Sequence, residues 1–262
     1  RSQNSRCTNW KKQCKQKLFS QKTEKFINRS ILKQFMDDVF EEWNIYASKR
    51  SLKVRDMDID ELAENSKLKI VSITGIRRAG KSSVLMLLQQ KLGKKGKVAY
   101  INLEDSRISG DKDVLDNILK WFGDTGFLLL DELTNANDWQ GWLARNHEML
   151  KGKLSIITTS SRKSLAVPSK PLRGRMLAYE LYPLSFKEFL AFKNVELEKT
   201  TAGVGKIERA LDEYITRGGF PEVVLLIDHT DKIKVLNSYF KDIIGLDVSE
   251  ISKENINVVE TF

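Results

Sequence analysis

A short segment of this sequence carries the residue types that bind a phosphate chain. Residues 75–82 read Gly-Ile-Arg-Arg-Ala-Gly-Lys-Ser, which matches the pattern G-x-x-x-x-G-K-[ST]. Glycines let the backbone curl so that successive N–H groups point at phosphate oxygens, and a following helix adds the positive end of its dipole. In this chemistry Lys81 reaches the β- and γ-phosphates, and the Ser82 hydroxyl binds magnesium. The residues predicted to bind nucleotide are Gly75, Ile76, Arg77, Arg78, Ala79, Gly80, Lys81, Ser82 and Ser83.

Two acidic residues end an apolar segment farther along the chain. Residues 127–132 read Phe-Leu-Leu-Leu-Asp-Glu. In P-loop proteins such a pair places one carboxylate in the magnesium shell and the other beside the γ-phosphate. We therefore assign Asp131 to the metal, directly or through water, and Glu132 to orienting and activating the attacking water. Two solvated acids at the end of a strand are the alternative. Because a catalytic water needs a base beside it, the pair favours hydrolysis over phosphoryl transfer to a small molecule.

Hydroxyl and guanidinium groups elsewhere could assist this chemistry. Residues 158–161 read Thr-Thr-Ser-Ser after an apolar segment, and hydroxyls there could hold the attacking water or sense the γ-phosphate. Ordinary turn chemistry explains the same residues equally well. Arg173 and Arg175 could stabilise the transferred phosphoryl charge, in cis or from a neighbouring subunit, or they could be plain surface charges.

The elements that must position these residues alternate between two patterns. Short apolar segments predict strands at 69–74, 98–103, 127–130 and 154–158, and amphipathic patterns predict helices at 82–92, 113–122 and 139–150. Such alternation is typical of an α/β fold with a mostly parallel sheet covered on both faces. Beyond Pro183 we expect helices near 185–193, 206–216 and 231–247, with a break at 217–221. The chemistry-bearing residues thus fall at the carboxyl ends of strands.

Positive charge is concentrated at the N-terminus. Residues 1–34 hold ten basic residues and one acidic residue, which gives +9, the formal net charge of the whole chain. The remaining residues carry 34 basic and 34 acidic groups, so they balance. A positive segment attracts polyanions, and Trp10 and Phe19 within it could stack on bases. DNA is therefore a candidate partner of this tail, and a solvated tail without a partner is the alternative.

An apolar stripe follows this tail. Its members recur at helical spacing: Ile31, Leu32, Phe35, Met36, Val39, Phe40 and Trp43. We expect an amphipathic helix that docks on the main domain, with self-association as the alternative. A charged connector at 48–68 leads into the domain. The expected divisions are a basic tail at 1–34, the helix and connector at 35–68, a P-loop core at 69–183, and a helical lid at 184–262.

Composition excludes several classes of protein. The chain has 262 residues, of which 41% are hydrophobic and 30% charged, and this supports a sizeable core. Cys7 and Cys14 form no disulfide framework, and no apolar run approaches the roughly 18 residues of a membrane span. We therefore expect a soluble, cytoplasmic protein that does not enter a membrane.

From about Val54 to its C-terminus, the chain resembles the archaeal-type ATPases of the AAA+ superfamily. The segments that carry the resemblance are ITGIRRAGKSS (73–83), YINLED (100–105), FLLLDELTNANDWQGW (127–142), IITTSS (156–161), LRGRMLAYELYPLSFKEFL (172–190) and RGGFPEVV (217–224). The resemblance implies ATP and Mg²⁺ as ligands, and a five-stranded parallel sheet followed by a small helical lid. It places the strand that ends at Thr158 between the phosphate-loop strand and the Asp131 strand.

The resemblance also suggests roles for single residues. Thr158 or Ser160 becomes the sensor of the γ-phosphate, whereas Thr159 stands where the family has glycine. Arg175 matches a recurrent arginine and is the preferred arginine finger, with Arg173 behind it. Gly218, Gly219 and Pro221 match a structural lid motif. Family members normally continue into a C-terminal effector domain, which we expect to lie outside this chain.

These observations lead to one expected function and one alternative. We expect a Mg²⁺-dependent ATPase that remodels or regulates DNA or a nucleoprotein complex. A homo-oligomer is one candidate form of this ATPase. The alternative is a slow-turnover, nucleotide-dependent switch or scaffold that presents its lid to a protein partner.

Overall fold

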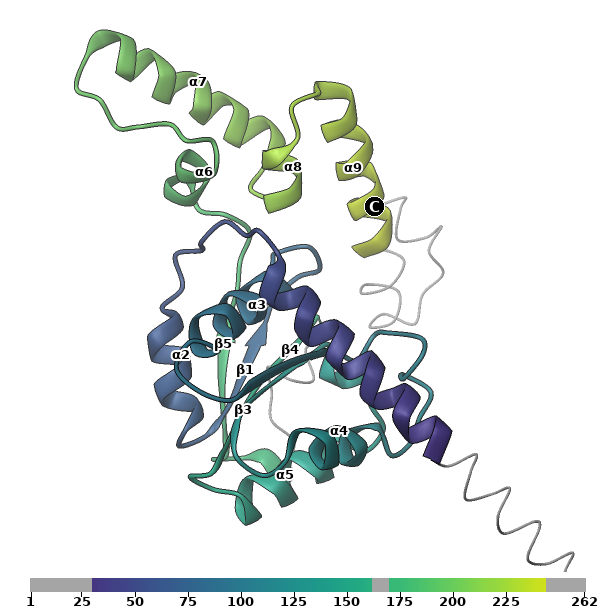
Figure 1. The fold of residues 1–262 in the computed structure, drawn as a ribbon. Helices are drawn as coiled ribbons and strands as arrows, with labels where there is room; N and C mark the ends of the chain where they lie inside the picture. Colours follow the sequence, from purple (N-terminus) through teal and green to yellow (C-terminus); the bar gives the residue numbers. More distant parts are fainter. Residues whose placement is uncertain (1–29, 162–169, 244–262) are drawn as a thin grey trace, which may run out of the picture.

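Five parallel strands form the centre of the core. The computed structural model describes residues 30–161 and 170–243 (Figure 1). The strands are β1 (Ile70–Thr74), β2 (Val98–Asn102), β3 (Gly126–Asp131), β4 (Leu154–Ser160) and β5 (Met176–Glu180). Their order across the sheet is β2-β3-β4-β1-β5, with every neighbouring pair parallel. The predicted α/β fold is confirmed, and so is the position of β4 between β1 and β3.

Helices cover both faces of this sheet. They are α2 (Ile59–Ser66), α3 (Lys81–Leu92), α4 (Val114–Phe122) and α5 (Trp139–Met149), with short 3-10 turns η1 (Leu133–Asn135) and η3 (Lys170–Leu172). Alternate strand residues pack on opposite sides: Leu128 and Leu130 lie with α4 and α5, whereas Leu129 lies with α2 and α3. The two buried clusters hold the strands in register. The carboxyl ends of all five strands therefore meet at one edge of the core.

The N-terminal helix departs in part from expectation. Residues 30–49 are helical, so residues 30–34 belong to this helix as well as to the predicted tail. Met36, Val39 and Phe40 are buried against the core, as predicted. The prediction is wrong for the start of the stripe, because Ile31 and Leu32 are 63% and 60% exposed. The basic residues 1–29 lie outside the described residues.

Two further elements were absent from the sequence prediction. The expected connector at 48–68 contains α2, whose N-cap Asp58 accepts hydrogen bonds from the backbone N–H groups of Asp60 and Glu61. Strand β5 also escaped the apolar pattern, because it lies at the edge of the sheet and its side chains alternate in exposure. Only the family resemblance implied a fifth strand.

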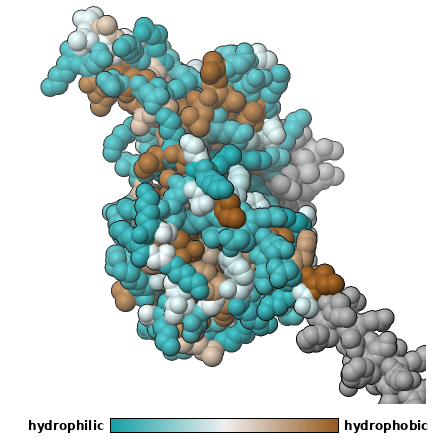
Figure 2. Space-filling view, in the orientation of Figure 1, coloured by the Kyte–Doolittle hydropathy of each residue, from teal (hydrophilic) through white to brown (hydrophobic). Residues whose placement is uncertain are grey.

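A helical lid stands on the edge of the core where the strands end (Figure 1). It comprises α6 (Phe186–Phe192), α7 (Thr201–Arg217), α8 (Pro221–Leu225) and α9 (His229–Asp242). Its own apolar cluster includes Leu184, Phe189 and Val224. The chain breaks after Arg217 as predicted, but Pro221 begins the additional helix α8. Figure 2 shows apolar side chains gathered on the lid, where Leu225 and Ile227 are exposed.

Candidate nucleotide site

The phosphate loop lies between β1 and α3, where the motif requires it. Gly75 has a φ of +140°, and a Cβ there would stand 2.1 Å from the carbonyl oxygen of Leu181. Gly80 is the N-cap of α3 with a φ of +99°. Both positions need glycine because L side chains rarely adopt such φ values. The N-terminus of α3 consequently opens toward the space enclosed by the loop.

Lys81 is held inside this loop. Its side-chain nitrogen donates hydrogen bonds to the carbonyl oxygens of Gly75 and Ile76, both at 3.0 Å. A third bond, of 2.9 Å, joins Lys81 Nζ to the Ser161 hydroxyl at the end of β4. The residue is only 5% exposed. The ammonium group is thus fixed at the mouth of the loop, among oxygen acceptors that phosphate oxygens could replace.

Asp131 lies at the end of β3 beside Ser82. It is 2% exposed and accepts hydrogen bonds from three hydroxyls: Tyr100 at 2.7 Å, Thr159, and Ser82. Burial raises the pKa of the Asp131 carboxyl, and these donors act in the opposite direction by stabilising its charge. The structure therefore brings together the two residues predicted to bind the metal.

The donor set around Asp131 fits magnesium. Mg²⁺ prefers oxygen ligands and is usually held by one or two carboxylates together with substrate phosphates and water. Asp131 and Ser82 supply a carboxylate and a hydroxyl at the phosphate loop. In the described part of the chain, no group of three or more His, Cys, Asp or Glu side chains offers a different metal site.

Glu132 follows Asp131 in a left-handed backbone conformation, with a φ of +50°. This turn directs its carboxylate to Ser161, which donates its backbone N–H at 3.2 Å and its hydroxyl at 2.8 Å. Because Lys81 donates to the same hydroxyl, Ser161 links the loop lysine to the predicted catalytic base. From the sequence, Ser161 is among the hydroxyls that could assist the chemistry, but the family resemblance favours Thr158 and Ser160 as sensors.

Thr159 reaches the site, whereas the two expected sensors face elsewhere. Its hydroxyl donates to Asp131 and accepts the backbone N–H of Glu132 at 2.9 Å. Strand β4 continues through Ser160, so threonine in place of glycine extends the strand. Thr158 and Ser160 alternate to the other side, and the Ser160 hydroxyl lies 2.9 Å from that of Thr134. The γ-phosphate sensor remains a prediction for these two residues.

Replacing Thr159 with valine is expected to weaken the metal site. Valine keeps the shape but removes one donor to Asp131, and loss of such a supporting bond typically costs about 10- to 100-fold in metal affinity. A Mg²⁺ titration of ATP hydrolysis should show a half-maximal concentration at least about 10-fold higher. Thr159→Ser, which keeps the hydroxyl, is the control. Equal Mg²⁺ requirements in all three proteins would contradict the prediction.

Arg173 and Arg175 precede β5 and lie at the opposite end of the sheet. The carbonyl oxygen of Arg175 accepts the backbone N–H of Ile70, the first residue of β1. The Arg175 side chain contacts the Pro171 carbonyl and Glu148. Arg175 is therefore at the end of the sheet away from the phosphate loop, and the expectation that it acts on the site of its own chain is wrong. A role in a neighbouring subunit stays a prediction.

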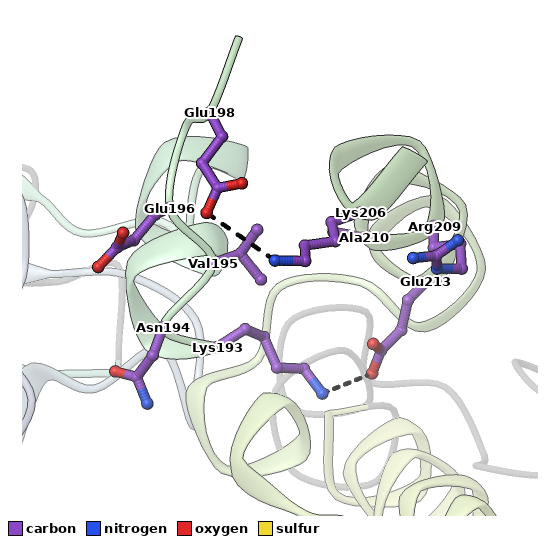
Figure 3. A pocket seen from close by; sticks show the side chains of 9 residues that line it. All are labelled: Lys193, Asn194, Val195, Glu196, Glu198, Lys206, Arg209, Ala210 and Glu213. Atoms are coloured by element: carbon purple, nitrogen blue, oxygen red, sulfur yellow. Dashed lines mark ion pairs between the residues drawn. The ribbon is translucent and has the colours of Figure 1, made fainter. Parts of the chain in front are cut away.

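A cleft of about 1110 Å³ surrounds the phosphate loop. The core lines it with Lys81, Ser82, Asp131, Glu132 and Ser161. Residues 50–53 and the lid helices α8 and α9 supply other walls. A second hollow, of about 560 Å³, lies within the lid between α7 and residues 193–198, which follow α6 (Figure 3). Two ion pairs lie in it: Lys193 with Glu213 at 2.9 Å and Lys206 with Glu198 at 3.9 Å. The first cleft holds the predicted site residues.

Two arginines connect the phosphate loop to the lid. The guanidinium of Arg78 lies over the ring of Tyr239 in α9, 5.3 Å from its centroid. Arg55 donates to the carbonyl oxygen of Ala79 in the loop and forms a buried ion pair with Glu188 in α6, at 2.7 Å. Arg78 thus faces the lid, and Arg77 lies 3.9 Å from Glu104. Both loop arginines are also among the residues that line the cleft.

Comparison with known families agrees with this geometry. Residues 67–190 match the family model described as "AAA domain". This region is similar to AAA domains and has the parallel α/β fold of a P-loop domain. The matched residues contain the phosphate loop, the Asp131–Glu132 pair and all five strands.

Similar proteins include two of archaeal and bacterial origin. The protein MJ1544 of Methanocaldococcus jannaschii is 36% identical over 214 residues, which are 79% of this chain and 47% of that protein. A protein of Haemophilus influenzae is 30% identical over 189 residues, 68% of this chain and 45% of that protein. The chain spans less than half the length of these curated relatives.

Solved structures are less similar to this chain. A STAND ATPase with a tetratricopeptide repeat sensor, from Pyrococcus horikoshii, aligns with a TM-score of 0.44 and 17% identity. The alignment covers 76% of this chain and 34% of that chain.

In the described part of this protein, no helix has both the length and the apolar content to cross a membrane.

Proposed function

We propose that this protein binds Mg·ATP and hydrolyses it. The observation that supports this most strongly is the link from Lys81 through Ser161 to Glu132, because it joins the phosphate-binding lysine to a carboxylate that could accept a proton from water. A domain that only bound phosphate would need no such carboxylate beside its lysine. Asp131 and Ser82 complete the arrangement with oxygen donors for the metal.

Each residue of the site has a separate role in the proposed reaction. Backbone N–H groups of residues 75–82 would bind the phosphates, and the Lys81 ammonium would exchange loop carbonyls for phosphate oxygens. Bound Mg²⁺ would neutralise charge on the phosphates, held by Asp131 and Ser82. Glu132 would orient the attacking water and accept its proton.

Work on DNA or a nucleoprotein complex is the further proposal. Its support is the charge of +9 on residues 1–34, which suits a polyanion. A homo-oligomer would let Arg175 of one subunit serve the site of another. The nucleotide-dependent switch remains the second candidate, and the contacts of Arg55 and Arg78 with the lid favour it, since they give the loop a route to the lid.

Replacing Lys81 with alanine is the direct test of nucleotide binding. Hydrogen bonds to charged groups contribute about 1.5–3 kcal/mol each, so ATP affinity should fall about 10- to 100-fold. Isothermal titration calorimetry with ATP and Mg²⁺ measures this change. Lys91→Ala is the matched control, because Lys91 lies in the same helix and pairs with Asp60 on the surface. Unchanged affinity in Lys81→Ala would refute the assignment of the loop.

A further inference from the structure

The amino ends of the five strands carry an unusual concentration of positive charge. We define the amino-end face as residues 66–69, 93–97, 123–125, 150–153 and 170–175, the segments that lead into β1, β2, β3, β4 and β5. They contain ten lysines and arginines and one acidic residue, Asp124. Residues 35–262 hold 34 basic and 34 acidic groups in total. Those outside the amino-end face therefore hold 24 basic and 33 acidic groups. These segments therefore carry a formal charge of +9, and the rest of residues 35–262 carries −9.

This face is at the end of the core away from the lid (Figure 1). In a parallel sheet, all amino ends lie along one edge, and the nucleotide cleft occupies the other. Backbone hydrogen bonds hold the segments together: the carbonyl oxygens of Lys97, Lys153 and Arg175 accept N–H groups of Phe127, Gly126 and Ile70. Neighbouring strands are about 4.8 Å apart, so five of them place these segments in a row of about 19 Å. The backbone that carries these charged side chains is therefore held in place by the sheet.

Most of these cations are not neutralised by carboxylates. Among the described residues of the amino-end face, only Lys67 and Arg175 lie within ion-pair distance of an acid, Glu64 at 2.6 Å and Glu148 at 3.5 Å. Lys151 and Lys153 are exposed, and so are Lys94 and Lys95. Stabilisation of helix dipoles by lysines at helix C-termini is the alternative explanation, and Lys97 does donate to the Phe122 carbonyl at the end of α4. Stabilising helix C-termini requires only a few lysines. It does not explain why ten basic residues share this face with a single acidic residue.

We propose that the amino-end face binds the phosphate backbone of duplex nucleic acid. Duplex DNA carries one negative charge per about 1.7 Å of its axis, so a row of about 19 Å would lie against on the order of ten charges. A row of cations on an ordered backbone suits a rigid, regular polyanion, because little loop ordering remains to oppose binding. This proposal rests on the proposed link to DNA and adds a second surface to the tail, on the side opposite the ATP site.

The test compares two charge reversals in the full chain. Lys151→Glu/Lys153→Glu changes the face, and Lys112→Glu/Lys199→Glu makes the same charge change at exposed residues outside it. Fluorescence anisotropy with a labelled DNA duplex, at several salt concentrations, measures binding. We expect the face variant to bind at least about 10-fold more weakly at low salt, with a salt slope reduced by about 2, since each lost phosphate contact accounts for about 0.9. The control should change less than about 3-fold.

Each outcome has a defined meaning. Equal losses in both variants, or none in the face variant, would overturn the proposal, and so would a loss measured only on anionic phospholipid vesicles. A wild-type protein that binds no duplex would overturn both this surface and the tail. ATP hydrolysis without DNA, measured in the same proteins, reports the proposed ATPase separately and should not change. Lys151→Gln/Lys153→Gln provides a milder change if charge reversal prevents folding.

Discussion

Replacing Glu132 with glutamine is expected to lower ATP turnover about 100- to 10,000-fold, the usual contribution of a positioned general base. Nucleotide affinity should stay within a few-fold of wild type, because glutamine keeps the size of the side chain. Its single amide oxygen can still accept the backbone N–H of Ser161, and its NH2 group can donate to the Ser161 hydroxyl. Phosphate release measures turnover, and calorimetric titration with ATP measures binding. The two measurements separate loss of the base from loss of the site.

Glu104→Gln is the matched control for this prediction. Glu104 lines the same cleft and lies 3.9 Å from Arg77, a predicted nucleotide-binding residue, but Glu104 itself is assigned no part in metal binding or proton transfer. The control should retain most of its turnover. Wild-type turnover in Glu132→Gln would remove the base assignment and support the reading of a solvated acid. Loss of ATP binding in that variant would instead indicate that Glu132 holds Lys81 in place through Ser161.

The sequence was most informative where one short segment carries the whole signal. The phosphate loop needs glycine at 75 and 80, lysine at 81 and a hydroxyl at 82, and its strand–loop–helix setting is local. The Asp131–Glu132 pair could be read for the same reason. Apolar segments buried on both faces also predicted four of the five strands.

The remaining features depend on how distant segments meet. Whether Thr158 or Thr159 faces Asp131 is decided by the pairing of β3 with β4, which places Leu130 opposite Thr158. The position of Arg175 depends on β5 adding to the edge of β1. Arg55 and Glu188 are 133 positions apart, and no local pattern identifies such a pair.

The second prediction with a large effect concerns this buried pair. Glu188→Gln is expected to lower the free energy of unfolding by about 3–5 kcal/mol, because it leaves the buried Arg55 guanidinium without its counter-charge. ATP affinity should fall as well, since Arg55 also donates to the Ala79 carbonyl in the phosphate loop. Urea unfolding and calorimetric ATP titration measure the two effects.

The same pair predicts a dependence of stability on pH. Burial alone raises the pKa of Glu188, but hydrogen bonds from Arg55 and from the backbone N–H groups of Asp56 and Ser185 outweigh it and bring the pKa to about 2, from an ordinary value of 4.5. A depressed pKa stabilises the folded state fully above the ordinary value. This contribution should be lost as the pH falls from 4.5 toward 2, and the wild type should lose more stability there than Glu188→Gln.

Two further variants decide whether burial of the pair is the cause. Lys187→Met breaks the neighbouring, exposed ion pair with Asp56, and the free energy of unfolding should change by less than about 1 kcal/mol. Arg55→Met/Glu188→Leu removes both buried charges and should recover much of the stability, because no unpaired charge remains. It should not recover ATP affinity, since the contact with Ala79 is still absent. If Glu188→Gln were as mild as Lys187→Met, the pair would not couple the loop to the lid. Recovery of stability without ATP affinity would assign to Arg55 both the support of the lid and the positioning of the phosphate loop.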